Sequence, residues 1–347
     1  MRGRKYTSVK PGIPDRPRGT RPLTAPEARG TQSRGTRHAS GRVILALARP
    51  CVIIFAFAVL MLPCSRLAAA LRAGADLLNM GVGARPAAMG SAYTAAASGV
   101  ESIFWNPAGL SAMTRREFGA MHSQWLLDSS LDSIGVGLPL SAGALGLGIV
   151  RLSHGGITAR AEDRSEAGTF EASDQVLSAA YGTAFGMFAL GAGIKFLRSS
   201  IGADSASTMA VDLGINRRLW NLPLSAGLAV QNMGPGLRYI SQTDPLPLSV
   251  SAGLAAEALP GLLMVLDVKR LVNDRQTSLS FGTEYRVMPA LAVRGGYSPI
   301  STGMQNPAGP GLGAGFGLTV MGTRFDYAMT PFGDLGNVHR LSMNCRF

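Results

Sequence analysis

Three histidines and one serine have the side-chain types that nucleophilic catalysis uses. His122, His154 and His339 lie in the patterned part of the chain, and Ser123 directly follows the first of them. A lipid hydrolase at the rim of a membrane barrel would need a histidine, a serine and a polar group that orients them. His122 and Ser123 are neighbours on a predicted strand, so their side chains point to opposite faces. We therefore treat hydrolysis as a remote alternative.

Gly81 and Gly83 suggest a second kind of chemistry, the binding of a dinucleotide phosphate. That motif needs a third glycine, and Pro86 stands in its place. No parallel strand–helix–strand pattern follows, and the chain has no metal-ligand spacing. We expect a protein without enzyme activity, metal or cofactor.

The formal net charge of +12 would suggest a nucleic-acid partner if it were spread along the chain. Residues 1–70 carry 13 of the 33 Lys and Arg residues but only two of the 21 acidic ones, Asp15 and Glu27. The remainder is therefore close to neutral, and we expect no nucleic-acid partner.

The basic N-terminal part has the order of a secretory leader. Arg42 and Arg49 precede an apolar stretch at 52–62, and the small residues of 68–70 follow. We predict a signal peptide at 42–70, cleaved near Ala70, and a mature protein in the bacterial outer membrane. Residues 1–41 are rich in Arg, Pro and Gly and are predicted to be disordered. An over-extended gene start would explain them.

From residue 117 onward, large apolar residues alternate with small or polar ones in segments of about ten, the pattern of a transmembrane barrel. In 311–320, for example, Leu312, Phe316 and Leu318 alternate with glycines. We predict an all-β fold, an antiparallel 14-stranded outer-membrane barrel over 117–347. The predicted strands are 117–127, 131–140, 143–153, 173–184, 187–197, 207–217, 222–232, 246–256, 260–270, 277–287, 289–298, 311–321, 323–330 and 338–347.

The connections between these strands also fit a barrel whose first and last strands both have their free chain ends on the inner side of the membrane. The longest predicted loops, 154–172, 233–245 and 299–310, all fall at outer positions, and the tight turns fall at inner ones. The last strand alternates through Leu341 and Met343 and stops on Phe347. Such a strand is what the barrel-assembly machinery reads, so we expect that machinery to be a partner.

Parity along the strands places most charged residues on the lumen side, because a charge that faces outer-membrane lipid costs roughly 2–4 kcal/mol at mid-membrane. An ion-pair network that fills the lumen is favoured over a dedicated ligand site. The predicted luminal charges are Lys195, Asp212, Asp267, Lys269, Glu284, Arg286, Arg294, Arg324, Asp326 and Arg340.

Residues 71–116 lack the alternation and are predicted to form an N-terminal hatch with small helices inside the barrel. Asn106 and Pro107 would make a fixed turn, and Arg85 is a candidate to anchor the hatch to a luminal carboxylate. The motif residues in this stretch are Gly81, Gly83, Arg85, Met89, Gly90, Tyr93, Trp105, Asn106, Pro107 and Gly109.

The order and spacing of these motif residues resemble the N-terminal signature of the PorV/PorQ family. That family is similar to the FadL-type transporters, which are 14-stranded barrels closed by an N-terminal hatch. The resemblance implies two functions. One is a conduit for small hydrophobic molecules, although the predicted 154–172 loop is polar and only Leu237, Tyr239 and Ile240 offer an apolar capture surface. The other is a type IX secretion accessory that binds secreted proteins.

Overall fold

The computed structural model describes residues 73–160, 163, 165–219, 223–239, 241–298 and 311–347. The predicted preamble at 1–41, the signal peptide at 42–70 and its cleavage near Ala70 all lie outside the described residues. Within the described part, no helix is long and apolar enough to cross a membrane.

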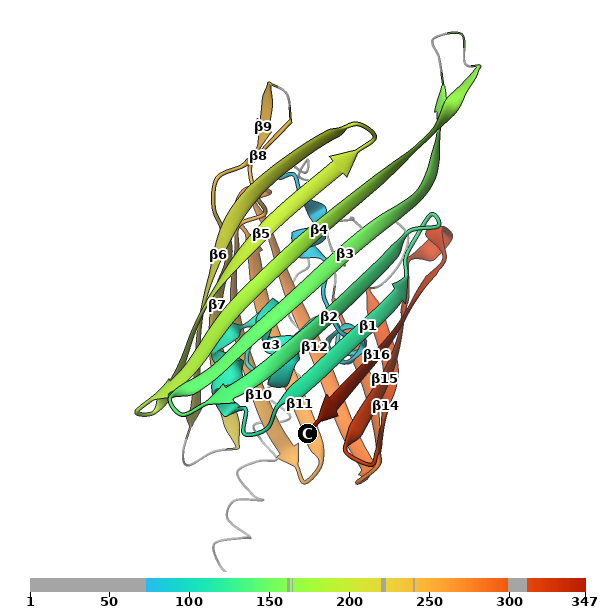
Figure 1. Ribbon diagram of the computed structural model, residues 1–347. Coiled ribbons are helices and arrows are strands. Elements are labelled where there is room, and N and C mark those ends of the chain that lie inside the picture. Colours follow the sequence, from blue (N-terminus) through green and yellow to red (C-terminus); the bar gives the residue numbers. More distant parts are fainter. Residues whose placement is uncertain (1–72, 161–162, 164, 220–222, 240, 299–310) are drawn as a thin grey trace, which may run out of the picture. The chain divides into compact units, whose positions relative to one another are not determined.

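Fourteen antiparallel strands form a closed barrel, as the alternation predicted (Figure 1). Closure depends on the pairing of the first strand with the last, from Glu117 opposite Arg346 to Gln124 opposite His339. The barrel strands are β1 (Glu117–Gln124), β2 (Ser130–Leu140), β3 (Gly143–Arg160), β4 (Glu166–Phe185), β5 (Phe188–Ile201), β6 (Asp204–Leu219), β7 (Leu224–Met233), β10 (Ser249–Leu259), β11 (Leu262–Leu271), β12 (Gln276–Met288), β13 (Leu291–Tyr297), β14 (Leu312–Val320), β15 (Thr323–Pro331) and β16 (Asn337–Arg346).

The two faces of the barrel wall differ as the period of two requires. On β5, Ile194 and Phe196 are exposed on the outside, while Lys195 and Leu197 are buried inside. Large apolar side chains are exposed in this way on every side of the barrel. A closed wall with an apolar outer belt is consistent with an outer-membrane barrel, because closure pairs the backbone groups that lipid cannot satisfy.

Two predicted outer loops contain strands, which corrects the predicted strand ends. β3 continues to Arg160 and β4 begins at Glu166, so most of 154–172 is a hairpin that extends past the barrel (Figure 1). The register shifts between His154 and Ile157, at two glycines. The loop at 233–245 likewise contains the small hairpin of β8 (Leu237–Tyr239) and β9 (Gln242–Asp244). The alternation of apolar and polar residues is weak in these two segments, because a strand that extends beyond the membrane does not need an apolar outer face.

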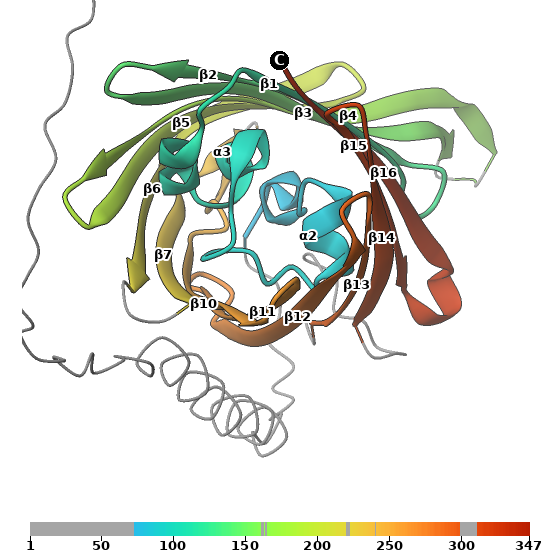
Figure 2. The ribbon, with the colours of Figure 1, turned by 90° about the horizontal axis from the view of Figure 1, so that it is seen from below.

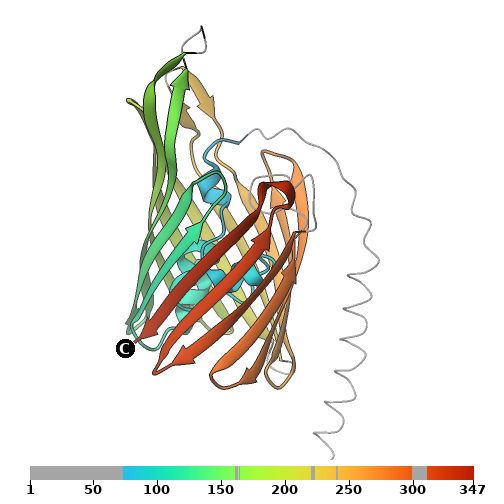
Figure 3. The ribbon, with the colours of Figure 1, turned by 90° about the vertical axis from the view of Figure 1, so that its right-hand side faces the viewer.

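The described part of the predicted hatch, residues 73–116, lies inside the barrel, and we call it the plug (Figure 2). Its start is held at the outer mouth, where the Gly74 amide donates to the Pro245 carbonyl. Its end reaches the inner rim, where the Arg116 carbonyl accepts from the Phe347 amide (Figure 3). Its short helices are η1 (Asp76–Asn79), α2 (Ala84–Ala88), η2 (Gly99–Glu101), α3 (Ser102–Trp105) and η3 (Pro107–Ala112).

The plug packs against the wall through backbone contacts that exclude a side chain. α2 lies against β13 to β16, and η3 lies against β3 to β6. Gly90, which follows α2, has φ +62°, and a Cβ there would overlap the backbone of Tyr297. On the facing strand, a Cβ on Gly296 would overlap the backbone of Met89 and Gly90. Glycine is therefore required on both sides of this contact.

We predict that Gly296→Ala destabilises the barrel by about 1–3 kcal/mol, because the added methyl group overpacks a backbone contact. Its chain neighbour is a matched control, since a Cβ on Gly295 would meet nothing within 4 Å. Denaturant unfolding in detergent micelles measures both variants. Equal losses for Gly295→Ala and Gly296→Ala would contradict the close approach.

Candidate functional site: the contact between plug and wall

The predicted anchor of the hatch, Arg85, lies buried at the centre of the plug–wall contact. Its Nε is 2.7 Å from Oε2 of Glu284 on β12, and its Nη2 is 3.0 Å from Oε1 of the same carboxylate. Its Nη1 donates to the Tyr93 hydroxyl at 2.9 Å. A two-point guanidinium–carboxylate pair fixes orientation as well as distance. α2 is thereby tied to one position on the wall.

The pair continues into a chain of buried charges around the lumen. Arg294 is 2.6 Å from Glu284 and 2.8 Å from Asp326. Arg324 in turn lies 2.7 Å from Asp326 and 3.5 Å from the plug carboxylate Glu101. Removing one member of such a network takes a counter-charge away from buried neighbours, which is costly. The network resists any movement of the plug.

Two further polar groups, Asp267 and Asn106, hold the middle of the plug through its backbone. Oδ2 of Asp267 accepts from the amides of Tyr93 and Thr94 at 2.8 and 2.7 Å. Asn106 is fully buried; its Nδ2 donates to the Thr94 carbonyl, and its Oδ1 accepts from the Ala108 amide. The Asn106–Pro107 turn is therefore a structural junction between two parts of the plug.

The remaining motif residues shape the same contact. Trp105 Nε1 donates to the Val82 carbonyl, and its ring meets Tyr93 edge to face at 5.9 Å. A Cβ on Gly81 would press on the Trp105 ring, and one on Gly109 would overlap the Ala97 carbonyl. The other members also lie in this contact: Gly83 beside Glu101, Met89 buried on β11 and β12, and Pro107 at the start of η3.

Several predicted luminal charges lie outside the Arg85 network. Lys195 and Asp212 pair at 2.7 Å beneath a register shift between β6 and β7, away from the Arg85 network. Arg340 is buried and stacks on the Trp125 ring at 5.0 Å. Arg286 shares the inward parity of Glu284 but is exposed near the inner end of β12, and it makes no ion pair with any described residue. The parity of the strand positions therefore predicted which face of the wall each charge lies on. It did not predict how far each charge lies from the end of the barrel.

A small polar cavity of about 50 Å³ lies between the plug and the wall at β7 and β10 to β12. Lys269, Asp267, Asn79 and Trp105 line it together with several serines. Its volume fits a few water molecules rather than a hydrocarbon. This part of the lumen is not suited to an apolar ligand.

A feature that the sequence analysis missed is an apolar cluster in the outer half of the lumen. Leu77 of η1 is buried there among inward-facing side chains of the wall. The wall residues of the cluster include Met121, Leu131, Val150, Leu152, Val176 and Leu197. The signal was present: in Ile149–Val150, Val176–Leu177 and Phe196–Leu197 the alternation gives way to two apolar residues in a row. Both faces of the wall are apolar at this height.

The histidines do not form a catalytic site with Ser123. His122 points outward with its Nδ1 2.6 Å from Asp132, whereas Ser123 is fully buried and donates to the His339 carbonyl. Ser129 lies 2.9 Å from Nδ1 of His154, but only 5% of that serine is exposed. A substrate could not approach its hydroxyl group in this arrangement.

The outer end of the plug is held among carboxylates. Ala73 donates its amide to Asp274, and Asp174 on β4 lies nearby. Partial burial raises the pKa of Asp76, and the negative charges of Asp274 and Asp174 raise it further. The charged form of Asp76 is therefore disfavoured where it sits.

The predicted assembly signal comprises Leu341 and Met343 on β16 and Phe347 just after it, and β16 is paired on both sides in the closed barrel. Leu341 and Phe347 are exposed on the outer face, and Met343 is half-buried. The edge that an assembly partner would read is therefore covered by β1 in the folded protein.

Comparison with solved structures finds barrels of similar fold. The toluene transporter TodX of Pseudomonas putida is 15% identical, and the match covers 76% of this chain and 96% of that chain with a TM-score of 0.57. The toluene transporter TbuX of Ralstonia pickettii is 14% identical, with coverage of 77% and 98% and a TM-score of 0.54. At these identities the likeness concerns the fold. No family model and no curated protein matches the sequence, so the resemblance to PorV/PorQ stays a prediction.

We predict that Arg85→Ala lowers the free energy of unfolding by about 3 kcal/mol, because it leaves Glu284 and Tyr93 buried without their shared partner. Arg286→Ala on the same strand as Glu284 is the matched control and should cost less than about 0.5 kcal/mol, as exposed sites do. Denaturant unfolding and proteolysis of the plug measure both. An Arg85→Ala variant as stable as the Arg286→Ala variant would show that the network does not hold the plug.

We predict that Asp76→Asn tightens the outer end of the plug at neutral pH. A carboxyl whose folded pKa is raised loses folded-state stability as the pH climbs above its ordinary value of 3.8. The asparagine removes that loss, so the Leu78 and Met80 amides should exchange more slowly at pH 7. The difference should vanish at a pH below 3.8, where both side chains are neutral. Asp204→Asn is the control for a lost outer charge.

Proposed function

We propose that this barrel is a conduit for small hydrophobic molecules across the outer membrane, gated by its plug. The observation that carries the proposal is a closed 14-stranded wall around an N-terminal plug, in a fold that matches nearly the full length of two toluene transporters. The apolar cluster in the outer half of the lumen supports it independently, since a polar-solute pore would not need one.

The entry site of this conduit is the apolar cluster that Leu77 fills. Its walls are Leu, Val and Met side chains from β1 to β5, and Leu237 and Tyr239 of the β8 hairpin pack against it from outside the barrel. Leu237 and Tyr239 were expected to offer an apolar capture surface, but Leu237 is buried in the cluster and Tyr239 is half-buried beside it. Ile240 lies outside the described residues. An apolar molecule that displaces Leu77 would keep the same contacts buried, so the exchange costs little hydrophobic free energy.

The barrier lies below this cluster. The Arg85 network and the polar cavity leave an apolar ligand no matching surface, and desolvating those charges would cost several kcal/mol. Passage therefore requires the plug to move or the wall to open. Among the described residues, ion pairs join the plug to the wall at Arg85 and Glu101, whereas hydrogen bonds from the amides of Ala73 and Gly74 hold its outer end. Movement should therefore begin at the outer end, beside the entry site.

We predict that Leu77→Lys reduces uptake of radiolabelled toluene by cells that carry the barrel in their outer membrane, to near the level of cells without it. A charge in the apolar cluster would bind no hydrocarbon. Leu335→Lys is the control, because Leu335 is an exposed outer residue outside the cluster. Leu77→Ala should instead leave a cavity, and the purified variant should bind toluene with a raised unfolding temperature. Equal uptake by the Leu77→Lys and Leu335→Lys barrels would overturn the proposed entry site.

The secretion-accessory alternative is supported by one feature, the hairpin of β3 and β4 beyond the barrel. Its segment 154–159 pairs only with β4 among the described strands, because β2 begins opposite Ser153. A free strand edge of this kind can bind an extended segment of another protein. Native mass spectrometry of the barrel taken from its own membrane separates the two functions: a bound apolar molecule supports the conduit, and a bound secreted protein with an empty lumen supports the accessory.

A further inference from the structure

A row of polar side chains crosses the outer face of the wall from β1 to β6. The pairing register places its members directly opposite one another, strand by strand. Their side chains point outward, because each differs by an even number of positions from an outward apolar residue of its strand. The members in order are His122, Asp132, Arg151, Gln175, Arg198 and Ser207.

The row marks the outer border of the apolar belt. Arg151 lies eight residues after Gly143, where β3 begins, and Arg198 lies ten residues after Phe188, where β5 begins. At ~3.3 Å per residue and a tilt of ~40°, both lie roughly 20–25 Å above the inner rim. The apolar band of such barrels is ~25 Å tall, so the row faces the headgroups of the outer leaflet.

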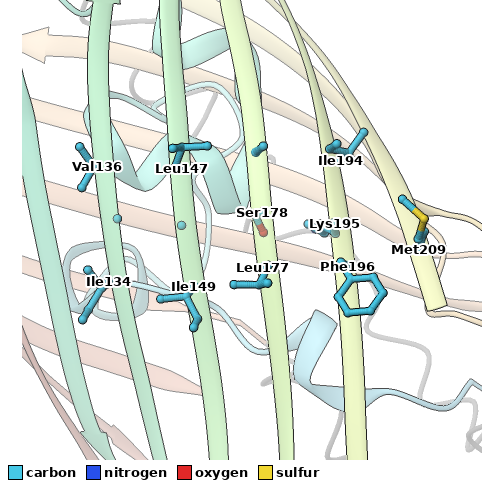
Figure 4. Close-up of a pocket in the computed structure, with 13 residues that line it drawn as sticks. Ile134, Val136, Leu147, Ile149, Leu177, Ser178, Ile194, Lys195, Phe196 and Met209 are labelled. Carbon is cyan, nitrogen blue, oxygen red and sulfur yellow. The ribbon is translucent and has the colours of Figure 1, made fainter. Parts of the chain in front are cut away.

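An apolar groove of about 480 Å³ lies next to the row, on its membrane-centre side and on the same outer face. Figure 4 shows the side chains that line it. Ile134, Ile149, Leu177, Phe196 and Met209 are the next outward residues on β2 to β6, and all five line it. One row further in, the outward residue of β4 is Ala179, whose small side chain leaves the hollow between Leu147 and Ile194.

The two arginines at the edge of this groove, Arg151 and Arg198, have no partner among the described side chains. Both guanidinium groups are exposed, and neither makes an ion pair or hydrogen bond with a described residue. Asp132, the cross-strand neighbour of Arg151, gives one oxygen to His122 at 2.6 Å and the other to Ser130 at 3.3 Å. The positive charge of the row is therefore open toward the membrane.

We propose that this face binds a membrane lipid of the outer leaflet whose headgroup carries phosphate. Arg151 and Arg198 would bind the phosphate oxygens, since the guanidinium fork matches a phosphate in geometry and charge. An acyl chain would lie in the groove against Leu177 and Phe196. The position of the charges relative to the groove selects this occupant, because a neutral hydrocarbon would use the groove and leave the arginines without a partner.

The test is native mass spectrometry of the full barrel in mild detergent, titrated with phosphatidylglycerol. The barrel should retain one lipid, and Arg151→Ala with Arg198→Ala should lower its occupancy about tenfold, as expected for two cationic contacts at a lipid surface. Arg218→Ala with Arg238→Ala is the control, because it removes two arginine charges away from the row. Ala179→Trp should abolish retention by filling the groove, whereas Ala314→Trp on the outward face of β14 should not.

The outcomes are separable from those of toluene uptake. Loss of lipid in both Arg151/Arg198 and Ala179 variants, with both controls unchanged, supports the site. Equal occupancy in all variants overturns it, and so does an equal loss in the Arg218/Arg238 control, which would indicate attraction by net charge alone. Retention of an uncharged apolar molecule in place of the lipid would also overturn it and assign the groove to the conduit.

Discussion

The rest of this structure depends on the pairing of β1 with β16. Within a hydrocarbon layer an unpaired backbone amide or carbonyl group costs several kcal/mol, and an open sheet edge would expose a row of them. Eight residues of β1 face eight of β16, and this single seam turns fourteen strands into a wall without an edge. A closed wall of this size encloses a lumen, which must hold either protein or water. The plug fills it, which imposes small side chains on the wall and charges on the contact.

The sequence predicted the wall well because lipid enforces a simple rule. Strands such as β2, β12 and β15 begin and end within one residue of the predicted limits, since one face had to be apolar wherever the chain meets hydrocarbon. The rule stops at the membrane border. There β3 and β4 continue as a hairpin whose residues have no common pattern, and the pairing that holds them is between backbone groups that hydropathy does not report.

The contact between plug and wall was less predictable. The parity of the strands identified Glu284 and Arg294 as inward-facing, but it could not show that Arg85 would meet Glu284, because their pairing spans 199 positions of the chain. It also placed Arg286 with them, although that residue lies where the wall opens at the inner rim. The apolar cluster around Leu77 was missed for the opposite reason. Alternation was expected to mark every strand, and its local absence was the informative signal.

The path of the plug has a consequence for the sidedness of the chain. Fourteen strands alone would return the chain to the side on which it started. The plug adds one more crossing, because its first described residues are bonded at the outer mouth and its last residue lies beside Phe347 at the inner rim. The number of crossings is therefore odd. Ala73 and Phe347 therefore lie at opposite ends of the barrel, and the described chain begins at the outer mouth and ends at the inner rim.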